Sequence, residues 1–242
     1  MTLTGKVALV TGGSRGIGAE IVRRLAAEGA DLGFTYRSAR ADAEAVAAQV
    51  RGLGRRAVVV RADLAEAEAA RDVVGAVTGE FGRLDVLVCN AGVTRWGAVA
   101  STTVEDFDRV VAVDARAPFL LMQAAAGTLA DGGRIVNICS GVTATAVPGI
   151  ALYSGAKAFL DQVTRVAALE FAARGITVNA VGPGSTATGP FAAMSDEQRS
   201  AAGSAFALGR IGEPADTAAL VGDPAVRFDT PGWMSRDLGE MF

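Results

Sequence analysis

The expected fold is decided by the stretch Thr11-Gly12-Gly13-Ser14-Arg15-Gly16-Ile17-Gly18, which lies between a short apolar run and a helix-like segment. Glycine allows positive φ and lets another group approach the backbone closely. A helix that begins at about Gly16 directs its free N–H groups and the positive end of its dipole at whatever lies above the turn. The stretch therefore predicts a turn that binds the pyrophosphate of a dinucleotide, with an ordinary tight turn as the alternative.

Outward from this turn, strand-like and helix-like segments alternate along the chain. We expect strands at 6–10, 31–36, 57–61, 84–89, 133–138 and 176–181. We expect helices at 16–28, 41–53, 66–80, 104–130 and 153–174. Continuous apolar runs are typical of strands buried on both faces of a parallel sheet. Right-handed crossovers then predict an α/β fold, a Rossmann-type doubly wound parallel sheet with helices on both faces.

No linker or repeat divides the 242 residues, so we expect a single dinucleotide-binding domain over residues 1–242. Two segments within it stand apart. Residues 185–209 are rich in small residues and are predicted to form a lid over a substrate. Residues 222–242 form an atypical C-terminus, because Gly222-Asp223-Pro224 interrupts a helix and Pro231 disfavours a central strand.

Composition excludes several function classes. The chain has no histidine, which removes Ser-His-Asp and Cys-His nucleophiles and zinc sites built on imidazole, and we expect no metal. The net charge is −3 with no basic run, so nucleic acid is not an expected partner. No uncharged stretch reads as a membrane span, and the N-terminus has no signal-peptide pattern, so we expect a cytoplasmic protein. Cys89 and Cys139 are expected to be buried free thiols.

Tyr153 and Lys157 are spaced so that the ammonium of one can act on the phenol of the other. Their i, i+4 spacing places both on one helix face, about 6 Å apart along the axis. A free phenol has a pKa of about 10, and a nearby ammonium favours the phenolate form. Such a phenol can give a proton to a ketone oxygen and take it back in the reverse reaction. The alternative is a surface tyrosine beside a solvated lysine.

Ser140 follows the expected strand 133–138. Ligands in α/β sheets gather at the carboxyl ends of the strands, where a hydroxyl can hold a carbonyl oxygen and share its developing charge. The alternative for Ser140 is a cap or loop hydroxyl.

Together these features resemble the short-chain dehydrogenase/reductase family, and in particular ketoreductases of the 3-oxoacyl-carrier-protein reductase type. The resemblance extends from about Lys6 to Asp216. It rests on motifs in the family's order, namely Thr11 before Gly12-x-x-x-Gly16-x-Gly18, Asn90-Ala91-Gly92, Ser140 thirteen residues before Tyr153, Tyr153-x-x-x-Lys157, and Asn179-Ala180-Val181-Gly182-Pro183-Gly184.

The resemblance implies roles for individual residues. Ser140 would position the substrate, Tyr153 would be the general acid/base, and Lys157 would also bind the nicotinamide ribose. The expected cofactor-binding set is Gly12, Ser14, Arg15, Gly16, Ile17, Gly18, Arg37, Ser38, Asp63, Leu64, Asn90, Ala91, Gly92, Tyr153, Lys157, Pro183, Gly184, Thr186 and Thr188.

Asp114 departs from the family, whose catalytic set usually has an asparagine at the matching position. A carboxylate can accept from water or from Lys157, but it cannot donate as an amide does. A buried negative charge also opposes the effect of Lys157 on the phenol. We expect Asp114 to anchor a water chain in the catalytic set, with some loss of rate.

The expected cofactor is NADP(H). NAD-selective sites usually have an acidic residue after the second strand, whereas this chain has Arg37 and Ser38, with Arg37 19 positions beyond Gly18. Arg37 and Arg15 are suited to bidentate contacts with a 2′-phosphate, unless both are solvated surface arginines. Asp63 matches an adenine-side contact or, alternatively, a helix N-cap.

We therefore expect NADPH-dependent reduction of a 3-oxoacyl, cyclic or polyketide-like ketone to a secondary alcohol. The alternatives are the reverse oxidation, a non-catalytic NADP-binding sensor or scaffold, and a carrier-protein-docking subunit that uses Arg95, Arg116 and Arg134. The helix at 153–174 has apolar residues on more than one side, so a homodimer or homotetramer is expected. The residues expected to line the substrate pocket are Val93, Trp96, Val142, Val147, Ile150, Phe191 and Met194.

Overall fold

The structure is a computed structural model that describes residues 3–204, 206 and 209–222. Six strands form one parallel sheet in the order β3-β2-β1-β4-β5-β6. The chain moves outward from β1 to β3, then returns past β1 to β4, and this reversal makes a ligand-binding crevice at the carboxyl ends of β1 and β4. The expected doubly wound α/β fold is confirmed. The strands are β1 (Val7–Val10), β2 (Asp31–Tyr36), β3 (Ala57–Arg61), β4 (Leu84–Cys89), β5 (Leu129–Ile138) and β6 (Thr177–Val181).

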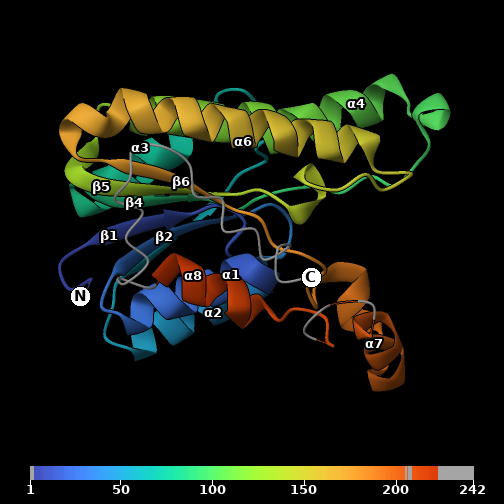
Figure 1. Cartoon of the computed structure of the whole chain (residues 1–242). Helices are drawn as coiled ribbons and strands as arrows, with labels where there is room; N and C mark the ends of the chain where they lie inside the picture. The colour runs from blue at the N-terminus through green and yellow to red at the C-terminus, as the bar shows by residue number, and fades with distance from the viewer. Residues whose placement is uncertain (1–2, 205, 207–208, 223–242) are drawn as a thin grey trace.

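Helices cover both faces of the sheet (Figure 1). One face carries α1 (Gly16–Ala27), α2 (Arg40–Gly52) and α8 (Pro214–Gly222). The other face carries α3 (Ala69–Phe81), α4 (Val104–Val111), the π-helical turn η2 (Ala112–Arg116), α5 (Ala117–Ala125) and α6 (Ala151–Phe171). The remaining helical segments are η1 (Val99–Ser101), η3 (Gly141–Thr143), η4 (Ala172–Arg174), η5 (Gly189–Ala193) and α7 (Asp196–Gly203). None of the helices in the described ranges has both the length and the apolar character needed to cross a bilayer.

Successive residues of β1 face opposite layers, which explains the continuous apolar run. Val7 and Leu9 pack in the core beneath α3, α5 and α6. Ala8 and Val10 pack in the core beneath α1, α2 and α8. Side chains alternate between the two faces of a strand, so a strand covered on both sides needs an apolar residue at every position.

Several expected boundaries were wrong. The predicted helix 104–130 is three segments, α4, η2 and α5, and it ends at Ala125. The strand expected from Gly133 begins at Leu129, because Leu129 pairs with Leu84 in the sheet before the register shifts. The alanine-rich sequence favours a helix, and strand pairing overrides that preference. The helix expected from Glu66 begins at Ala69, and the one expected from Tyr153 begins two residues earlier.

The predicted C-terminal irregularity at 222–242 lies outside the described residues, except that α8 ends at Gly222. The predicted lid 185–209 is described in part and contains η5 and α7. In Figure 1, α7 projects away from the sheet.

Gly33 provides a test of how tightly the layers pack. A Cβ at Gly33, on β2, would lie 2.3 Å from Val77 Cγ2 on α3, so a methyl group cannot be accommodated without a shift. Gly33→Ala should lower the free energy of unfolding by about 1–3 kcal/mol in urea unfolding. The matched control is Gly75→Ala in α3, where a Cβ meets nothing within 4 Å. This variant should gain about 0.5–1 kcal/mol. Equal stability of the two variants would contradict this packing.

Candidate active site

The glycine turn between β1 and α1 forms a cradle of backbone. Gly12 and Gly16 have φ values of +67° and +56°, a region that side-chain-bearing residues rarely adopt. A Cβ at Gly18 would lie 2.2 Å from the Gly12 carbonyl oxygen, so only glycine fits there. No side chain caps the first turn of α1, which leaves that helix end suited to an anion. The turn thus has the features that a pyrophosphate requires.

The neighbouring Asn90 segment, after β4, is fastened to this turn. Asn90 Nδ2 donates to the carbonyl oxygens of Thr11 at 2.9 Å and Gly12 at 3.3 Å. In return, Thr11 Oγ1 accepts from the N–H groups of Asn90 at 2.9 Å and Ala91 at 3.0 Å. The structure therefore brings the Asn90-Ala91-Gly92 segment and the glycine turn together, as expected.

Thr35 is a positioning residue of the turn that the sequence analysis missed. Its Oγ1 accepts from the Gly12 N–H at 2.9 Å, and its carbonyl oxygen accepts from the Gly13 N–H at 2.9 Å. Thr35 is buried on β2. No signal in the sequence distinguishes it, because threonine is common in strands.

A third segment, which follows β6, approaches the same turn. The Gly141 N–H donates to the Pro183 carbonyl oxygen at 3.0 Å, and Thr186 Oγ1 donates to the Gly184 carbonyl oxygen at 3.0 Å. Thr188 lies against the turn, since a Cβ at Gly16 would be 3.1 Å from Thr188 Cγ2. Of the expected residues in this segment, Thr188 therefore borders the cradle, whereas Pro183 is bonded to the loop that carries Ser140.

The expected adenine side is formed by the ends of β2 and β3. Arg15, Arg37 and Ser38 are exposed at the surface. Arg61 Nε donates to the Arg37 carbonyl oxygen at 3.3 Å and adds a third cation to this edge, which the sequence analysis did not single out.

Asp63 accepts hydrogen bonds from a backbone N–H and from a guanidinium group. Its Oδ1 accepts from the Ala65 N–H at 3.0 Å and from Arg109 Nη1 at 2.8 Å. Partial burial opposes ionisation, but the Ala65 N–H and the Arg109 guanidinium hold the pKa of Asp63 below its ordinary value. The alternative of an N-cap on the following helix is wrong, because α3 begins only at Ala69. The adjacent Leu64 is buried.

Tyr153 and Lys157 lie together on α6. The Lys157 Nζ is 5.7 Å from the centroid of the Tyr153 ring and donates to the Ile138 carbonyl oxygen at 2.9 Å. Ile138 is the last residue of β5, so the ammonium is fixed at the carboxyl edge of the sheet. Lys157 is only 3% exposed, whereas Tyr153 is partly open to solvent. The alternative of a solvated surface lysine is wrong.

Ser140 follows β5 on the loop that leads to α6. Its Oγ accepts from the Val142 N–H at 3.4 Å, so it also has the capping role named as its alternative. Ser154, next to Tyr153, donates from Oγ to the Val142 carbonyl oxygen at 3.2 Å. This bond fastens the Ser140 loop to the first turns of α6.

Asp114 lies in η2 and is fully buried. Its Oδ1 is 3.1 Å from Lys157 Nζ, and its Oδ2 accepts from the Val93 N–H at 3.0 Å. A Cβ at Gly92 would lie 2.7 Å from Oδ1, so this glycine makes room for the carboxylate. The structure thus pairs Asp114 directly with Lys157, where the sequence analysis expected an anchor for a water chain.

The two thiols are free and buried, as expected. Burial raises the pKa of both Cys89 and Cys139 to about 12, against an opposing attraction from Lys157. A thiol that remains protonated at neutral pH is a poor nucleophile, so neither residue is suited to covalent catalysis.

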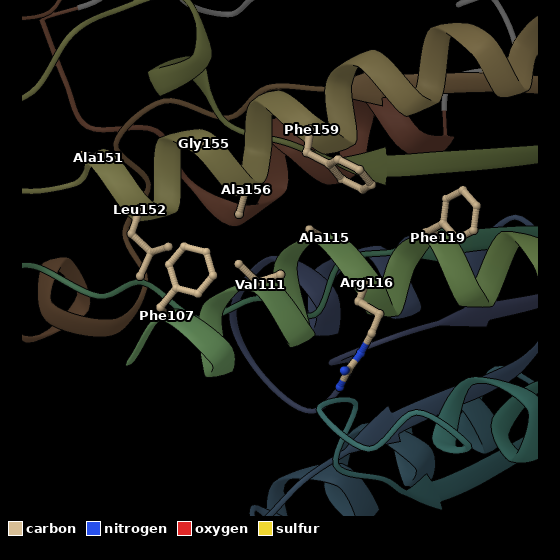
Figure 2. A pocket seen from close by; sticks show the side chains of 10 residues that line it. All are labelled: Phe107, Val111, Ala115, Arg116, Phe119, Ala151, Leu152, Gly155, Ala156 and Phe159. Carbon is tan, nitrogen blue, oxygen red and sulfur yellow. The ribbon is translucent and has the colours of Figure 1, made fainter. Parts of the chain in front are cut away.

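An apolar hollow of about 680 Å³ lies on the outer helical layer (Figure 2). Phe107, on α4, and Leu152, on α6, face one another across it, whereas Arg116 turns away and donates to the Ala65 carbonyl oxygen. None of the seven residues expected to line a substrate pocket borders this hollow. Of those seven, Ile150 is buried in the core and Trp96 is 57% exposed.

Comparisons with known proteins agree with this arrangement. A family model described as short chain dehydrogenase matches residues 6–199. The chain is 39% identical over 183 residues to hydroxynaphthalene reductase of Aspergillus fumigatus, which covers 76% of this chain and 67% of that protein. It is 37% identical over 246 residues to versicolorin reductase 1 of Aspergillus parasiticus, which covers 96% and 93%.

Solved structures show the same likeness. A dehydrogenase/reductase from Sinorhizobium meliloti is 44% identical, with a TM-score of 0.90 over 98% of this chain and 96% of that one. A short chain dehydrogenase from Burkholderia cenocepacia, in complex with NADP, is 43% identical, with a TM-score of 0.86 over 96% of each chain. The angucycline C-6 ketoreductase LanV, with bound NADP, is 37% identical, with a TM-score of 0.88 over 97% and 95%.

The family model spans most of the chain, and the glycine cradle, the Asn90 segment and the Tyr153–Lys157 pair lie where the fold requires them. The chain belongs to the short-chain dehydrogenase family of oxidoreductases.

Proposed function

We propose that the chain reduces a ketone to a secondary alcohol with NADPH as the hydride donor. One observation carries the proposal. The Lys157 ammonium lies 5.7 Å from the ring of Tyr153 and is bonded to the last carbonyl of β5, two residues before Ser140. A proton donor, a cation and a hydroxyl therefore share the sheet edge at which the glycine turn offers its cradle.

Each side chain has a distinct task in this proposal. The Tyr153 hydroxyl donates its proton to the carbonyl oxygen as charge develops there. Ser140 Oγ donates a hydrogen bond to the same oxygen and orients the ketone. Lys157 stabilises the phenolate that remains after proton transfer. NADPH, when bound, supplies the hydride, and its pyrophosphate fits the cradle of Gly12, Gly16 and Gly18.

The preference for NADP(H) rests on the arginines at the adenine side. Arg15 lies in the glycine turn and Arg37 directly follows β2, both are exposed, and no acidic residue comes directly after β2. Guanidinium groups suit a 2′-phosphate. The complexes of the Burkholderia protein and of LanV with NADP support this preference.

Of the expected 3-oxoacyl, cyclic and polyketide-like ketones, we propose the cyclic or polyketide-like ones as substrates. The relatives named for hydroxynaphthalene and for an angucycline support a ring-shaped substrate. Trp96 offers a large aromatic surface beside Gly149, since a Cβ at Gly149 would lie 3.7 Å from its ring. Residues 185–209 are proposed to cover the bound substrate.

The alternatives receive less support. A non-catalytic sensor or scaffold would not need a buried lysine aimed at a tyrosine. A carrier-docking patch would need free arginines, but Arg95 pairs with Asp106, and Arg116 and Arg134 donate to backbone carbonyl oxygens. The reverse oxidation uses the same residues.

We also propose that the face around the apolar hollow is covered by a second copy of the chain. Phe107, Phe119 and Phe159 are each about half exposed on α4, α5 and α6. On α6, Phe159, Val166 and Leu169 are exposed while Leu160 is buried, so the helix has the two apolar sides that the sequence predicted. A twofold axis would bring the same surface of each copy together.

Replacing Tyr153 tests the acid role. In Tyr153→Phe, kcat/KM for NADPH-dependent reduction across a panel of cyclic ketones should fall by about a hundredfold or more. NADPH binding, followed by nucleotide fluorescence, should persist. Tyr36→Phe removes the only other tyrosine and should retain activity. Cofactor binding by the unmodified chain without turnover of any ketone would favour the sensor instead.

Replacing Arg37 tests cofactor choice. Arg37→Asp should weaken NADPH binding by roughly ten- to a hundredfold, because it removes a charge-assisted contact, and should change NADH binding much less. Arg71→Asp, at an exposed ion pair on α3, serves as the control with no expected effect on either. Equal losses for both nucleotides would argue against the assignment.

The oligomeric state of the chain, measured by sedimentation, tests the proposed interface. The unmodified chain should sediment as a dimer or tetramer, and Phe159→Glu should shift it to a smaller species. Leu53→Glu alters another half-exposed apolar residue, at the end of α2, and should leave the size unchanged. A monomeric unmodified chain would refute the interface.

A further inference from the structure

The ion pair between Asp114 and Lys157 is buried to a degree that requires an explanation. Asp114 is 0% exposed and Lys157 is 3% exposed, with 3.1 Å between Oδ1 and Nζ. Taking both charges out of water is costly, and their attraction does not by itself make such a pair stabilising. The carboxylate is thus better explained by what it does to Lys157 than by stability.

Each partner changes the proton affinity of the other. Burial raises the pKa of the Asp114 carboxyl, against the opposing attraction of Lys157. Burial would lower the pKa of Lys157, but the Asp114 carboxylate, acting together with Tyr153 and Cys139, raises it above its ordinary value. The Lys157 ammonium is therefore retained, with a compensating negative charge held against it.

Among the residues that the structure describes, the groups other than Tyr153 that act on the pair are neutral thiols or charges that have partners of their own. Both neighbouring thiols stay neutral because burial raises their pKa to about 12. Arg109, which acts on Asp114, is itself paired with Asp63. Asp161, which acts on Cys139, is paired with Arg165. Among the described residues, the charged and titratable groups that face the pair are Tyr153, Cys89, Cys139, Arg109 and Asp161.

From these contacts we infer that Asp114 is a positioning residue that fixes Lys157 and offsets its charge beside the reacting phenol of Tyr153. The phenol faces a nearly neutral pair rather than a lone cation. Reduction needs the protonated phenol, whereas oxidation needs the phenolate as proton acceptor. This inference rests on the proposed function and adds the role of one further residue to it.

The test removes the charge and keeps the shape. In Asp114→Asn, Lys157 retains the Ile138 carbonyl as acceptor but loses its counter-ion. The midpoints of the pH profiles of kcat/KM, for both reduction and oxidation, should move down by about one pH unit or more. Asp161→Asn removes a carboxylate one turn further along α6, and its profiles should coincide with those of the unmodified chain.

A second readout does not depend on turnover. The chain has two tyrosines, so subtracting the ultraviolet phenolate titration of Tyr153→Phe leaves that of Tyr153. The same subtraction between Asp114→Asn and the double variant with Tyr153→Phe should show phenolate forming at lower pH. Should Asp114→Asn fail to fold, Asp114→Ser enters the comparison.

The outcomes separate the two proposals. Loss of thermal stability with unmoved pH profiles and phenolate titration would show that Asp114 is merely structural. A midpoint that moves up would show that Asp114 serves to keep Lys157 charged. Either result overturns the inference. Absence of turnover in the unmodified chain would refute the proposed function, and the phenolate titration would still decide the role of Asp114.

Discussion

The ammonium of Lys157 is held at the carboxyl end of β5 by a hydrogen bond to the Ile138 carbonyl oxygen and by an ion pair with the Asp114 carboxylate. A charge buried to this extent persists only where partners are fixed in advance. One partner comes from the sheet and the other from η2, so the position of Lys157 depends on α6, β5 and η2 packing together. Tyr153 lies on the same helix, α6, one turn before Lys157.

The parallel sheet brings the cradle to this cation. Its reversal at β1 places the glycine turn, the Asn90 segment and the Ser140 loop at neighbouring strand ends. Hydrogen bonds then fix these loops to one another, from Asn90 to the turn and from Gly141 to Pro183. Since these bonds end on backbone carbonyl oxygens, the geometry of the loops tolerates little change. The site is therefore built by several loops at the edge of the sheet and not by one loop alone.

Most of this arrangement could be predicted from the sequence, because apolar runs and glycine spacing report local requirements. The strand positions, the cradle and the Tyr153–Lys157 pair follow from such patterns. The start of β5 at Leu129 could not be predicted, since it depends on pairing with Leu84, which is distant in the sequence. The Thr35 contact and the direct approach of Asp114 to Lys157 are equally non-local. The sequence shows that Asp114 stands where the family usually has asparagine. Only the structure shows that its partner is Lys157.

The decisive measurement is a crystal structure of the complex with NADPH. It should show a pyrophosphate over the turn from Gly12 to Gly18 and a nicotinamide ribose against Tyr153 and Lys157. Lys157 should keep its contact with Asp114 in that complex. A nucleotide bound elsewhere, or a Tyr153 hydroxyl directed away from the nicotinamide, would contradict this arrangement.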